Sequence, residues 1–361
     1  NFFLEKIPFD NIWLKKERWY EEKHITLLGG KSAVSLDANN KKISLNDGKE
    51  IGYEKLLLAV GGCARKFSGA GGDKKGVFVL RSLDDAKAII AATKAAKQAV
   101  AVGGGFVSFE MCEMLRMAEI EVTLLIREDY YWQNLLDEPS GLMIEEALIK
   151  GGVKILRKTE IAEILGSDKV EGVLLKDDNR LACDMIIVGI GLACPFAWVE
   201  QAGVAVNRGI VTNEYLETSA KDIWAAGDAA EFNDLILEEK VQLGNWVNAQ
   251  MQGRTAGFNM AGKKEPFRLV SFYTTQGFGI TIAFVGDVRP EKDRIIIPRG
   301  SSEIGSYGRI LIKDGEVVGA TLINRTQELG IITKIIEKNI KTAGRENNFS
   351  NPDFNLAELL K

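Results

Sequence analysis

The sequence has little histidine and no paired cysteines. Of its 361 residues only His24 is a histidine. Since catalytic triads and most zinc sites use histidine, we expect neither a Ser-His-Asp hydrolase nor a metal centre. Four cysteines form no Cys-x-x-Cys motif, so a dithiol centre is not expected within this sequence, whereas a reducing, cytoplasmic location is. Each of them is expected to be a small buried core residue: Cys63, Cys112, Cys183 and Cys194.

The sequence also lacks an excess of positive charge and any long hydrophobic run. With 46 Lys and Arg against 50 Asp and Glu, the net charge of -4 offers no basic surface for nucleic acid. Its longest apolar stretch, residues 185–193, is far shorter than the roughly 20 residues of a membrane-spanning helix. The sequence opens without a basic region followed by an apolar run, so no secretory signal is expected. These observations exclude a nucleic-acid partner and a membrane span from our expectations.

The first part of the chain predicts short strands followed by a helix. Strands are expected at residues 25–28, 42–45 and 56–60, with a hairpin turn at Asn46-Asp47-Gly48. Ser82 precedes an Ala- and Lys-rich segment that extends to about residue 97, and an acid follows three positions later. This pattern is typical of a capped helix N-terminus.

A β-α-β unit with a glycine-rich turn is predicted next. A strand at residues 99–102 leads into Gly-Gly-Gly-Phe-Val-Ser, then into a helix at residues 107–118 and a strand at residues 121–126. Gly103 and Gly105 allow a sharp turn and close approach of a pyrophosphate to the helix N-terminus, and Ser108 is small enough for close helix–strand packing. The segment therefore predicts a dinucleotide-binding site.

The residues after the second strand bear on the choice of coenzyme. An acid at this strand end would bind the ribose hydroxyls of NAD, but the chain has Ile126 and Arg127 there. Arg127 favours NADPH slightly over NADH, because a guanidinium pairs well with a 2′-phosphate. The alternative is a solvated loop cation neutralised by Glu128 and Asp129.

The remainder of the chain predicts one more helix, several strands and a strand-rich tail. The helix covers residues 136–150 and ends at Gly151-Gly152; strands follow at residues 153–156, 162–165, 170–175 and 185–188, the last two joined as a hairpin by residues 176–179. Gly189-Ile190-Gly191 is expected to mark a domain boundary. From residue 269 onward we expect a hairpin around residues 313–315, whose edge would serve a homodimer, and a helix at residues 329–338.

Three further segments carry a resemblance to a known family. They are LLLAVGG at residues 56–62, TSAKDIWAAGDAAEF at residues 218–232 and LGNWVNAQMQGRTAGFNMAG at residues 243–262. With the glycine-rich turn, they make the chain resemble the FAD-dependent pyridine nucleotide-disulfide oxidoreductase superfamily, in particular its ferredoxin reductase, rubredoxin reductase and NADH oxidase-like branch. The sequence departs from that pattern at its N-terminus, where the family's first FAD-binding G-x-G-x-x-G segment is not found.

The resemblance implies an α/β fold with two Rossmann-like domains, one interrupting the other, and a small α+β C-terminal domain. The FAD-binding domain would comprise residues 1–80 and 191–268, the NAD(P)-binding domain residues 81–190, and the C-terminal domain residues 269–361. The implied FAD contacts are Gly61, Gly62, Gly227, Asp228, Trp246 and Ala249. The implied NAD(P) contacts are Gly103, Gly105, Ser108, Arg127 and Gly191, with Phe106 and Glu110 near the flavin and nicotinamide.

The function implied by the resemblance is hydride transfer from NAD(P)H to FAD, followed by electron transfer to an external acceptor. The acceptor would be a small iron–sulfur protein, a quinone or oxygen. Two alternatives stay open. One is a CoA-disulfide or peroxide reductase whose cysteine lies in the missing N-terminal segment, and the other is a redox-inactive nucleotide-binding scaffold.

Overall fold

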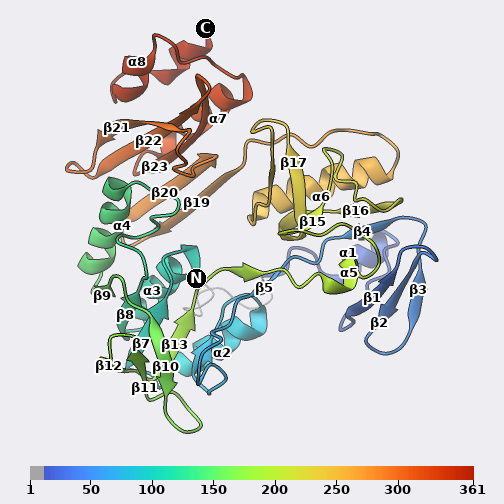
Figure 1. Ribbon diagram of the computed structural model, residues 1–361, viewed down its shortest axis with the longest axis horizontal. Coiled ribbons are helices and arrows are strands. Elements are labelled where there is room, and N and C mark those ends of the chain that lie inside the picture. The colour runs from blue at the N-terminus through green and yellow to red at the C-terminus, as the bar shows by residue number, and fades with distance from the viewer. Residues whose placement is uncertain (1–11) are drawn as a thin grey trace. The chain divides into compact units, whose positions relative to one another are not determined.

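The computed structural model describes residues 12–361, which belong to two compact units (Figure 1). The first unit comprises the chain up to Gly62 together with Cys194–Arg268. The second unit comprises Cys63–Ala193 and Leu269–Lys361. Each unit is therefore built from two separate stretches of chain. The three-domain division expected from the sequence has boundaries that differ from those of these two units, and it stays a prediction.

The first unit combines three small sheets with one long helix. A three-stranded antiparallel sheet is formed by β1 (Ala33–Asp37), β2 (Lys42–Leu45) and β3 (Glu50–Gly52), which confirms the predicted turn between residues 45 and 50. The apolar strand β4 (Leu56–Leu58) pairs in parallel with β16 (Ile223–Ala225). A third sheet contains β15 (Ile210–Val211), β17 (Ala230–Asp234) and β18 (Glu239–Val241). The helical elements are α1 (Glu17–Glu22), α5 (Ala197–Glu200), η2 (Gly227–Ala229) and α6 (Trp246–Met260).

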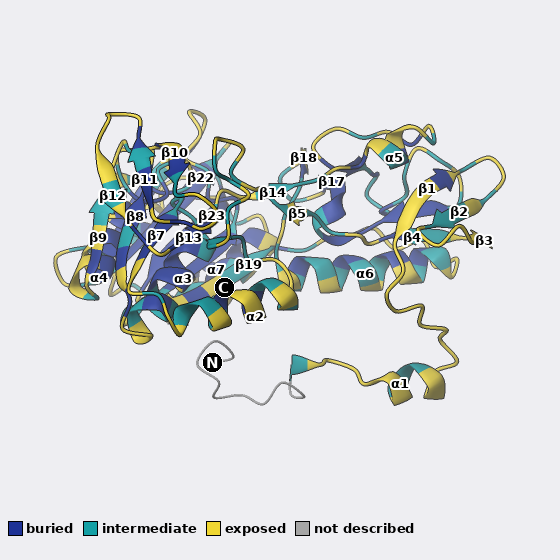
Figure 2. Ribbon diagram, turned by 90° about the horizontal axis from the view of Figure 1, so that it is seen from below, coloured by how far each residue is buried: buried dark blue, intermediate teal, exposed yellow. Residues whose placement is uncertain are grey.

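The predicted strand at residues 25–28 is wrong. These residues are irregular and exposed, and they follow α1, a short helix that the sequence did not predict and that buries none of its residues. Figure 2 shows α1 largely in the colours of exposed and half-exposed residues. Alternating apolar residues form a strand only where a partner strand accepts their hydrogen bonds, and residues 25–28 have none among the described residues.

The second unit begins with a five-stranded parallel sheet. Its order is β6 (Val77–Phe78), β13 (Met185–Val188), β7 (Gln98–Val102), β8 (Glu121–Leu125) and β9 (Val153–Leu156). The central strands are buried (Figure 2), and the accompanying helices are α2 (Leu83–Thr93), α3 (Phe106–Met117) and α4 (Glu138–Lys150). The predicted capping box is confirmed, because Ser82 Oγ accepts the Asp85 N–H and the Asp85 carboxylate accepts the Ser82 N–H. The predicted end of α4 is also confirmed, with Gly152 in the left-handed region at φ 83°.

Strand β13 corrects one predicted pairing. The expected hairpin exists, but it joins β11 (Gly172–Leu175) to β12 (Arg180–Ala182), next to β10 (Ile161–Leu165). Residues 185–188 instead pair in parallel with β7. All four side chains of β13 are buried, as expected for a strand inside a parallel sheet. A short pairing of β5 (Cys63–Ala64) with β14 (Leu192–Ala193) completes this part of the unit.

The C-terminal part of the second unit is an antiparallel sheet in the order β19 (Phe272–Gly277), β20 (Ile280–Gly286), β23 (Glu316–Ile323), β22 (Ser306–Lys313) and β21 (Ile295–Ser301). The predicted hairpin at residues 313–315 is confirmed. It joins the interior strands β22 and β23, so the expectation that it presents a free edge is wrong, and the edges are β19 and β21. The remaining elements are η3 (Thr326–Glu328), α7 (Leu329–Glu337), α8 (Glu346–Ser350) and η4 (Leu356–Leu360).

The structure also bears on the cysteines and on membrane insertion. Cys112 and Cys183 are buried, and burial raises the pKa of each thiol to about 12. Cys63 is exposed and Cys194 half-buried, so the expectation of four buried cysteines is wrong for these two.

Within residues 12–361, no helix combines the length and the apolar character that crossing a membrane requires.

Candidate nucleotide and flavin sites

The glycine-rich turn between β7 and α3 is held by close backbone packing. Gly103 has φ 109°, and a Cβ there would lie 2.4 Å from the Gly189 carbonyl oxygen. Gly105 is the N-cap residue of α3. Ser108 is fully buried and its hydroxyl donates to the Val102 carbonyl at 3.2 Å. A Cβ on Gly189 would lie 2.5 Å from Ser108 Oγ, so these two small residues allow the close approach of α3 to β13.

A cavity of about 650 Å³ opens beside this turn, entirely within the second unit. Residues 103–105 and residues 189–191 line it. Gly191 has φ 95°, and a Cβ there would have no atom of the described residues within 4 Å. The N-terminus of α3 faces this region with N–H groups that have no acceptor in the helix. Such a helix terminus, with the dipole of α3 behind it, suits an anionic pyrophosphate.

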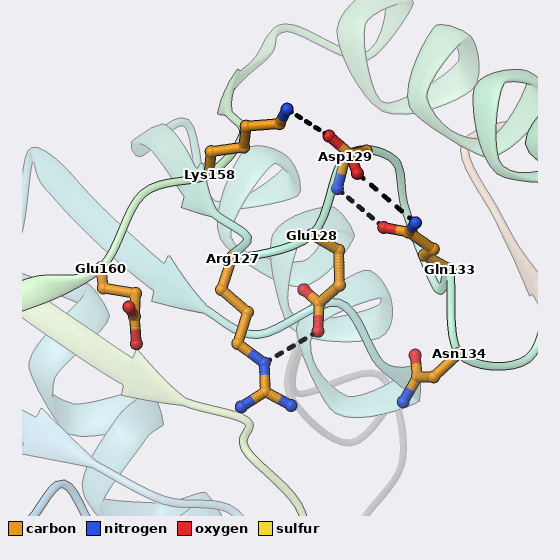
Figure 3. Close-up of a pocket in the computed structure, with 7 residues that line it drawn as sticks. All are labelled: Arg127, Glu128, Asp129, Gln133, Asn134, Lys158 and Glu160. Carbon is orange, nitrogen blue, oxygen red and sulfur yellow. Dashed lines mark hydrogen bonds and ion pairs between the residues drawn. The ribbon is translucent and has the colours of Figure 1, made fainter.

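A second, more open pocket of about 560 Å³ shares four lining residues with the first, namely Arg127, Glu128, Asn134 and Glu160. Figure 3 shows its lining, in which Arg127 Nε donates to Glu128 Oε1 at 3.0 Å. The Arg127 side chain is 74% exposed, and its two terminal nitrogens point away from Glu128 (Figure 3). On the other side Lys158 Nζ lies 2.5 Å from Asp129 Oδ1, and its hydrogen bond lowers the pKa of that carboxyl. The pocket thus offers one guanidinium with exposed terminal donors beside three carboxylates.

Phe106 and Glu110 occupy the first turns of α3. The Phe106 ring packs edge-on against Trp132, Tyr273 and Phe284 at centroid distances of 4.2, 3.9 and 5.4 Å. Glu110 Oε1 accepts the Tyr273 hydroxyl at 3.2 Å and the Thr275 hydroxyl at 2.8 Å, which ties α3 to β19. Burial raises the pKa of Tyr273, with the Glu110 charge adding to the effect, so the phenol stays a donor. Sequence reasoning did not find Tyr273, because its partner lies more than 160 residues away in the chain.

The flavin-motif residues of the first unit surround the turn η2. Gly227 has φ 76°, and its N–H donates to Gln252 Oε1 at 2.8 Å. Gln242 Nε2 donates to the Asp228 carbonyl at 2.7 Å. These two amides fix the backbone of the turn while the Asp228 carboxylate remains partly exposed. A Cβ on Gly227 would lie 3.4 Å from that of Ala249.

Two buried polar atoms near this turn have no partner among residues 12–361. Asn248 Oδ1 and Gln252 Nε2 are both buried without a hydrogen bond, on side chains one helical turn apart along α6. A buried polar atom without a hydrogen bond destabilises the folded protein, so we expect a polar group of a ligand beside these two atoms. One acceptor, one donor and the Asp228 carboxylate suit the hydroxylated chain of FAD, so these residues fit the cofactor. Trp246 is 63% exposed one turn before Ala249, while Gly61 (φ 63°) and Gly62 follow β4.

The comparisons with known proteins agree with this geometry. Residues 5–253 match the family described as pyridine nucleotide-disulphide oxidoreductase, and the chain belongs to that family. It is 29% identical, over 95% of its length and 83% of the relative's, to the biphenyl dioxygenase system ferredoxin–NAD(+) reductase component of Paraburkholderia xenovorans. It is 29% identical, over 97% of its length and 86% of the relative's, to the NADH-rubredoxin oxidoreductase of Clostridium acetobutylicum.

A solved structure gives the same result for the fold. The crystal structure of the covalent putidaredoxin reductase–putidaredoxin complex matches with a TM-score of 0.93 and 27% identity over 99% of this chain and 87% of that one. The predicted family and the predicted fold class, with two Rossmann-like domains and a C-terminal α+β domain, are confirmed. The protein is a FAD-dependent oxidoreductase that moves electrons from a nicotinamide nucleotide through FAD to an external acceptor.

Proposed function

We propose that the external acceptor is a small iron–sulfur protein of the ferredoxin or rubredoxin class. The cavity of about 650 Å³ beside the glycine turn, which offers a helix N-terminus for a dinucleotide, carries the nucleotide-binding half of this proposal. The names of the two relatives above, a ferredoxin reductase component and a rubredoxin oxidoreductase, support the choice of acceptor.

In this proposal the second unit binds the nicotinamide nucleotide. Gly103 and Gly105 leave room for the pyrophosphate at the N-terminus of α3, and Ser108 holds that helix against the sheet. Gly191 lines the same cavity and contributes no side-chain atoms to it. Phe106 would cover the nicotinamide end, and Glu110 would fix the helix that carries it through its hydrogen bonds to β19.

The first unit would hold FAD. The Asp228 carboxylate would accept a ribityl hydroxyl, and Asn248 and Gln252 would offer a buried acceptor and donor from α6. Gly61, Gly62 and Gly227 allow close approach of the cofactor to the backbone, with Trp246 and Ala249 along α6. Bound FAD would supply the redox chemistry that the protein side chains cannot perform. It would accept two electrons from the nicotinamide nucleotide and pass them one at a time to the acceptor.

Three broader assignments belong to the same proposal. The FAD domain comprises residues 1–80 and 191–268, the NAD(P) domain residues 81–190, and the C-terminal domain residues 269–361. Four free thiols favour a cytoplasmic location. A homodimer, if formed by strand pairing, would use the edge strands β19 or β21.

Anaerobic reduction of candidate acceptors tests the proposed function. The FAD-loaded protein and NADPH or NADH are mixed in turn with a [2Fe–2S] ferredoxin, a rubredoxin, a benzoquinone, CoA disulfide and, separately, oxygen, and the loss of NADPH or NADH absorbance is followed for each acceptor. We expect an iron–sulfur protein to be reduced with the highest kcat/KM. A higher kcat/KM for CoA disulfide would contradict the proposal, as would a protein that binds nucleotide but retains no flavin.

We further propose that Arg127 favours NADPH over NADH. Only its Nε is used by Glu128, which leaves the terminal nitrogens for a 2′-phosphate. Arg127→Gln is expected to lower kcat/KM for NADPH by about ten-fold, the value of one charge-assisted contact, and that for NADH by less than two-fold. Ferricyanide serves as acceptor in these assays.

Glu128→Gln is the matched control, since it removes the neighbouring charge and keeps Arg127. It is expected to leave NADPH turnover unchanged or improved, because the guanidinium loses the neighbouring negative charge. Unchanged turnover of both NADPH and NADH in Arg127→Gln would show that Arg127 is only a solvated loop cation, and an equal loss of both would show that it does not select NADPH.

A further inference from the structure

An aromatic segment between β8 and α4 lies against the dinucleotide turn. The Tyr131 side chain is fully buried, and its hydroxyl donates to the Gly105 carbonyl at 2.7 Å. The Tyr131 N–H donates to Glu145 Oε1 in α4 at 2.9 Å. Burial raises the pKa of Tyr131 well above its ordinary value, so its hydroxyl keeps its proton and remains a donor. The segment is thereby fixed both to the N-cap of α3 and to α4.

The next residue, Trp132, has a backbone conformation that bulky residues rarely adopt. Its φ is 61°, in the left-handed region. The conformation is held by the Trp132 carbonyl, which accepts the N–H groups of Leu135 at 2.7 Å and Leu136 at 2.8 Å. Backbone conformations of this kind persist where the surrounding structure fixes them, and they are concentrated at ligand-binding sites.

This conformation places the indole at the cavity. Trp132 lines the cavity of about 650 Å³ together with residues 103–105. Its backbone nitrogen lies 3.5 Å from the point where a Cβ on Gly104 would be, and its Nε1 lies 3.9 Å from the corresponding point at Gly105. The indole N–H, which has no protein acceptor among the described residues, is thus adjacent to the N–H groups at the start of α3.

We propose that Trp132 is a binding residue for the dinucleotide, with its indole N–H donating to a pyrophosphate oxygen. The inference rests on the proposed role of the glycine turn and adds a donor from outside the β-α-β motif. A phenyl ring could also make the edge contacts with Phe106 and Phe284, whose ring centroids lie 4.2 and 5.2 Å from that of Trp132, so these contacts do not by themselves require an indole. The N–H is the group that distinguishes Trp132 from a phenylalanine.

Isothermal titration of the FAD-loaded protein with NAD+, NADP+ and 2′-AMP tests this assignment. Trp132→Phe keeps an aromatic ring and removes the donor, and Trp19→Phe, on α1 of the first unit, is the matched control. We expect Trp132→Phe to weaken the binding of NAD+ and of NADP+ by the same factor, on the order of ten-fold, because one hydrogen bond to a charged group is lost. Binding of 2′-AMP, which has no pyrophosphate, is expected to be unchanged, and Trp19→Phe to match the parent protein.

The outcomes separate this inference from the proposed function. If the parent protein binds neither dinucleotide, the proposed nucleotide site fails and the role of Trp132 fails with it. If the parent protein binds both but Trp132→Phe binds them equally well, only the inference is overturned. A parallel loss of 2′-AMP binding overturns it too, because the indole would then act elsewhere than at the pyrophosphate.

A second measurement, by NMR, uses only the parent protein and so does not depend on the folding of a variant. In parent protein with ¹⁵N-labelled tryptophan, one indole N–H signal is expected to shift downfield on addition of NAD+ and to stay in place with 2′-AMP. If no indole signal moves with NAD+, the proposed hydrogen bond does not form.

Discussion

At the scale of single residues, the packing of the glycine-rich turn requires residues with very small side chains or none. Gly189 and Ser108 meet where α3 crosses β13, and a methyl group on Gly189 would overlap Ser108 Oγ. Ser108 fills the third position of the glycine motif, where its hydroxyl remains satisfied by the Val102 carbonyl. A small residue with one internal hydrogen bond therefore substitutes for the glycine that the motif usually has.

Gly189→Ala is expected to destabilise the second unit by about 1–3 kcal/mol, because the added carbon forces α3 away from the sheet. Displacement of the helix N-terminus should also weaken NAD+ binding. Urea unfolding followed by circular dichroism and titration with NAD+ measure the two effects.

Ser108→Ala in the Gly189→Ala background is the diagnostic control. Removing the hydroxyl creates the space that the new methyl group needs, so the double variant should be more stable than the sum of the two single changes allows. Additive losses would mean that the close approach of Gly189 to Ser108 does not limit the packing.

At the scale of elements, the N-terminus of α2 provides a local test. Ser82 and Asp85 exchange hydrogen bonds, and both residues are exposed or half-buried. Ser82→Ala is expected to cost about 1 kcal/mol of unfolding free energy by leaving N–H groups of the first turn without an acceptor. Ser68→Ala, an exposed serine of the same unit without a capping role, serves as the comparison. A loss below about 0.3 kcal/mol would show that α2 does not contribute to the cooperative unfolding of the unit.

Elements with local signals were predicted well from the sequence. The β7-α3-β8 unit, the Ser82 cap and the hairpin at residues 313–315 each depend on residues within a few positions of one another. The predictions failed where a distant partner decides the structure. Residues 185–188 have the apolar character of a strand, but their partners on β6 and β7 lie far earlier in the chain.

The candidate site shows the same division. The glycines proposed to bind the dinucleotide could be found from spacing, since their motif is local. Trp132 was missed, because no motif includes it and its proposed role depends on a left-handed conformation that is not apparent in the sequence. The available signal was three consecutive aromatic residues, Tyr130, Tyr131 and Trp132, between the polar residues 127–129 and 133–134.

At the scale of the whole molecule, a buried charge cluster predicts how stability depends on pH. Asp287 follows β20, and its carboxylate accepts hydrogen bonds from Arg289 Nε and Arg294 Nη2, both at 2.8 Å. Burial opposes ionisation of Asp287, but the two guanidinium groups outweigh burial and hold its pKa below the ordinary value of 3.8. A lowered pKa means that the carboxylate stabilises the folded state fully above pH 3.8, and that this contribution is lost as the pH falls further.

Asp287→Asn should remove this acid-sensitive contribution and leave the buried Arg294 without its main counter-charge, at a cost of about 3 kcal/mol near neutral pH. Urea unfolding between pH 2.5 and 7 measures both effects. Asp168→Asn, in the exposed turn between β10 and β11, is the control and should change neither. An unchanged pH profile in Asp287→Asn would assign the acid sensitivity to other carboxylates.

The division of each unit into two chain segments has a consequence for synthesis of the protein on the ribosome. Strand β4 pairs with β16, so Leu56 emerges long before Ile223, its partner in the sheet. At about 5–20 residues per second the apolar strand waits on the order of ten seconds for that partner. During this interval the intervening part of the second unit can form its parallel sheet, which is complete once β13 has emerged. Translation speed between residues 58 and 223, and chaperones that cover exposed strands, should therefore influence the yield of folded protein more than changes near the C-terminus.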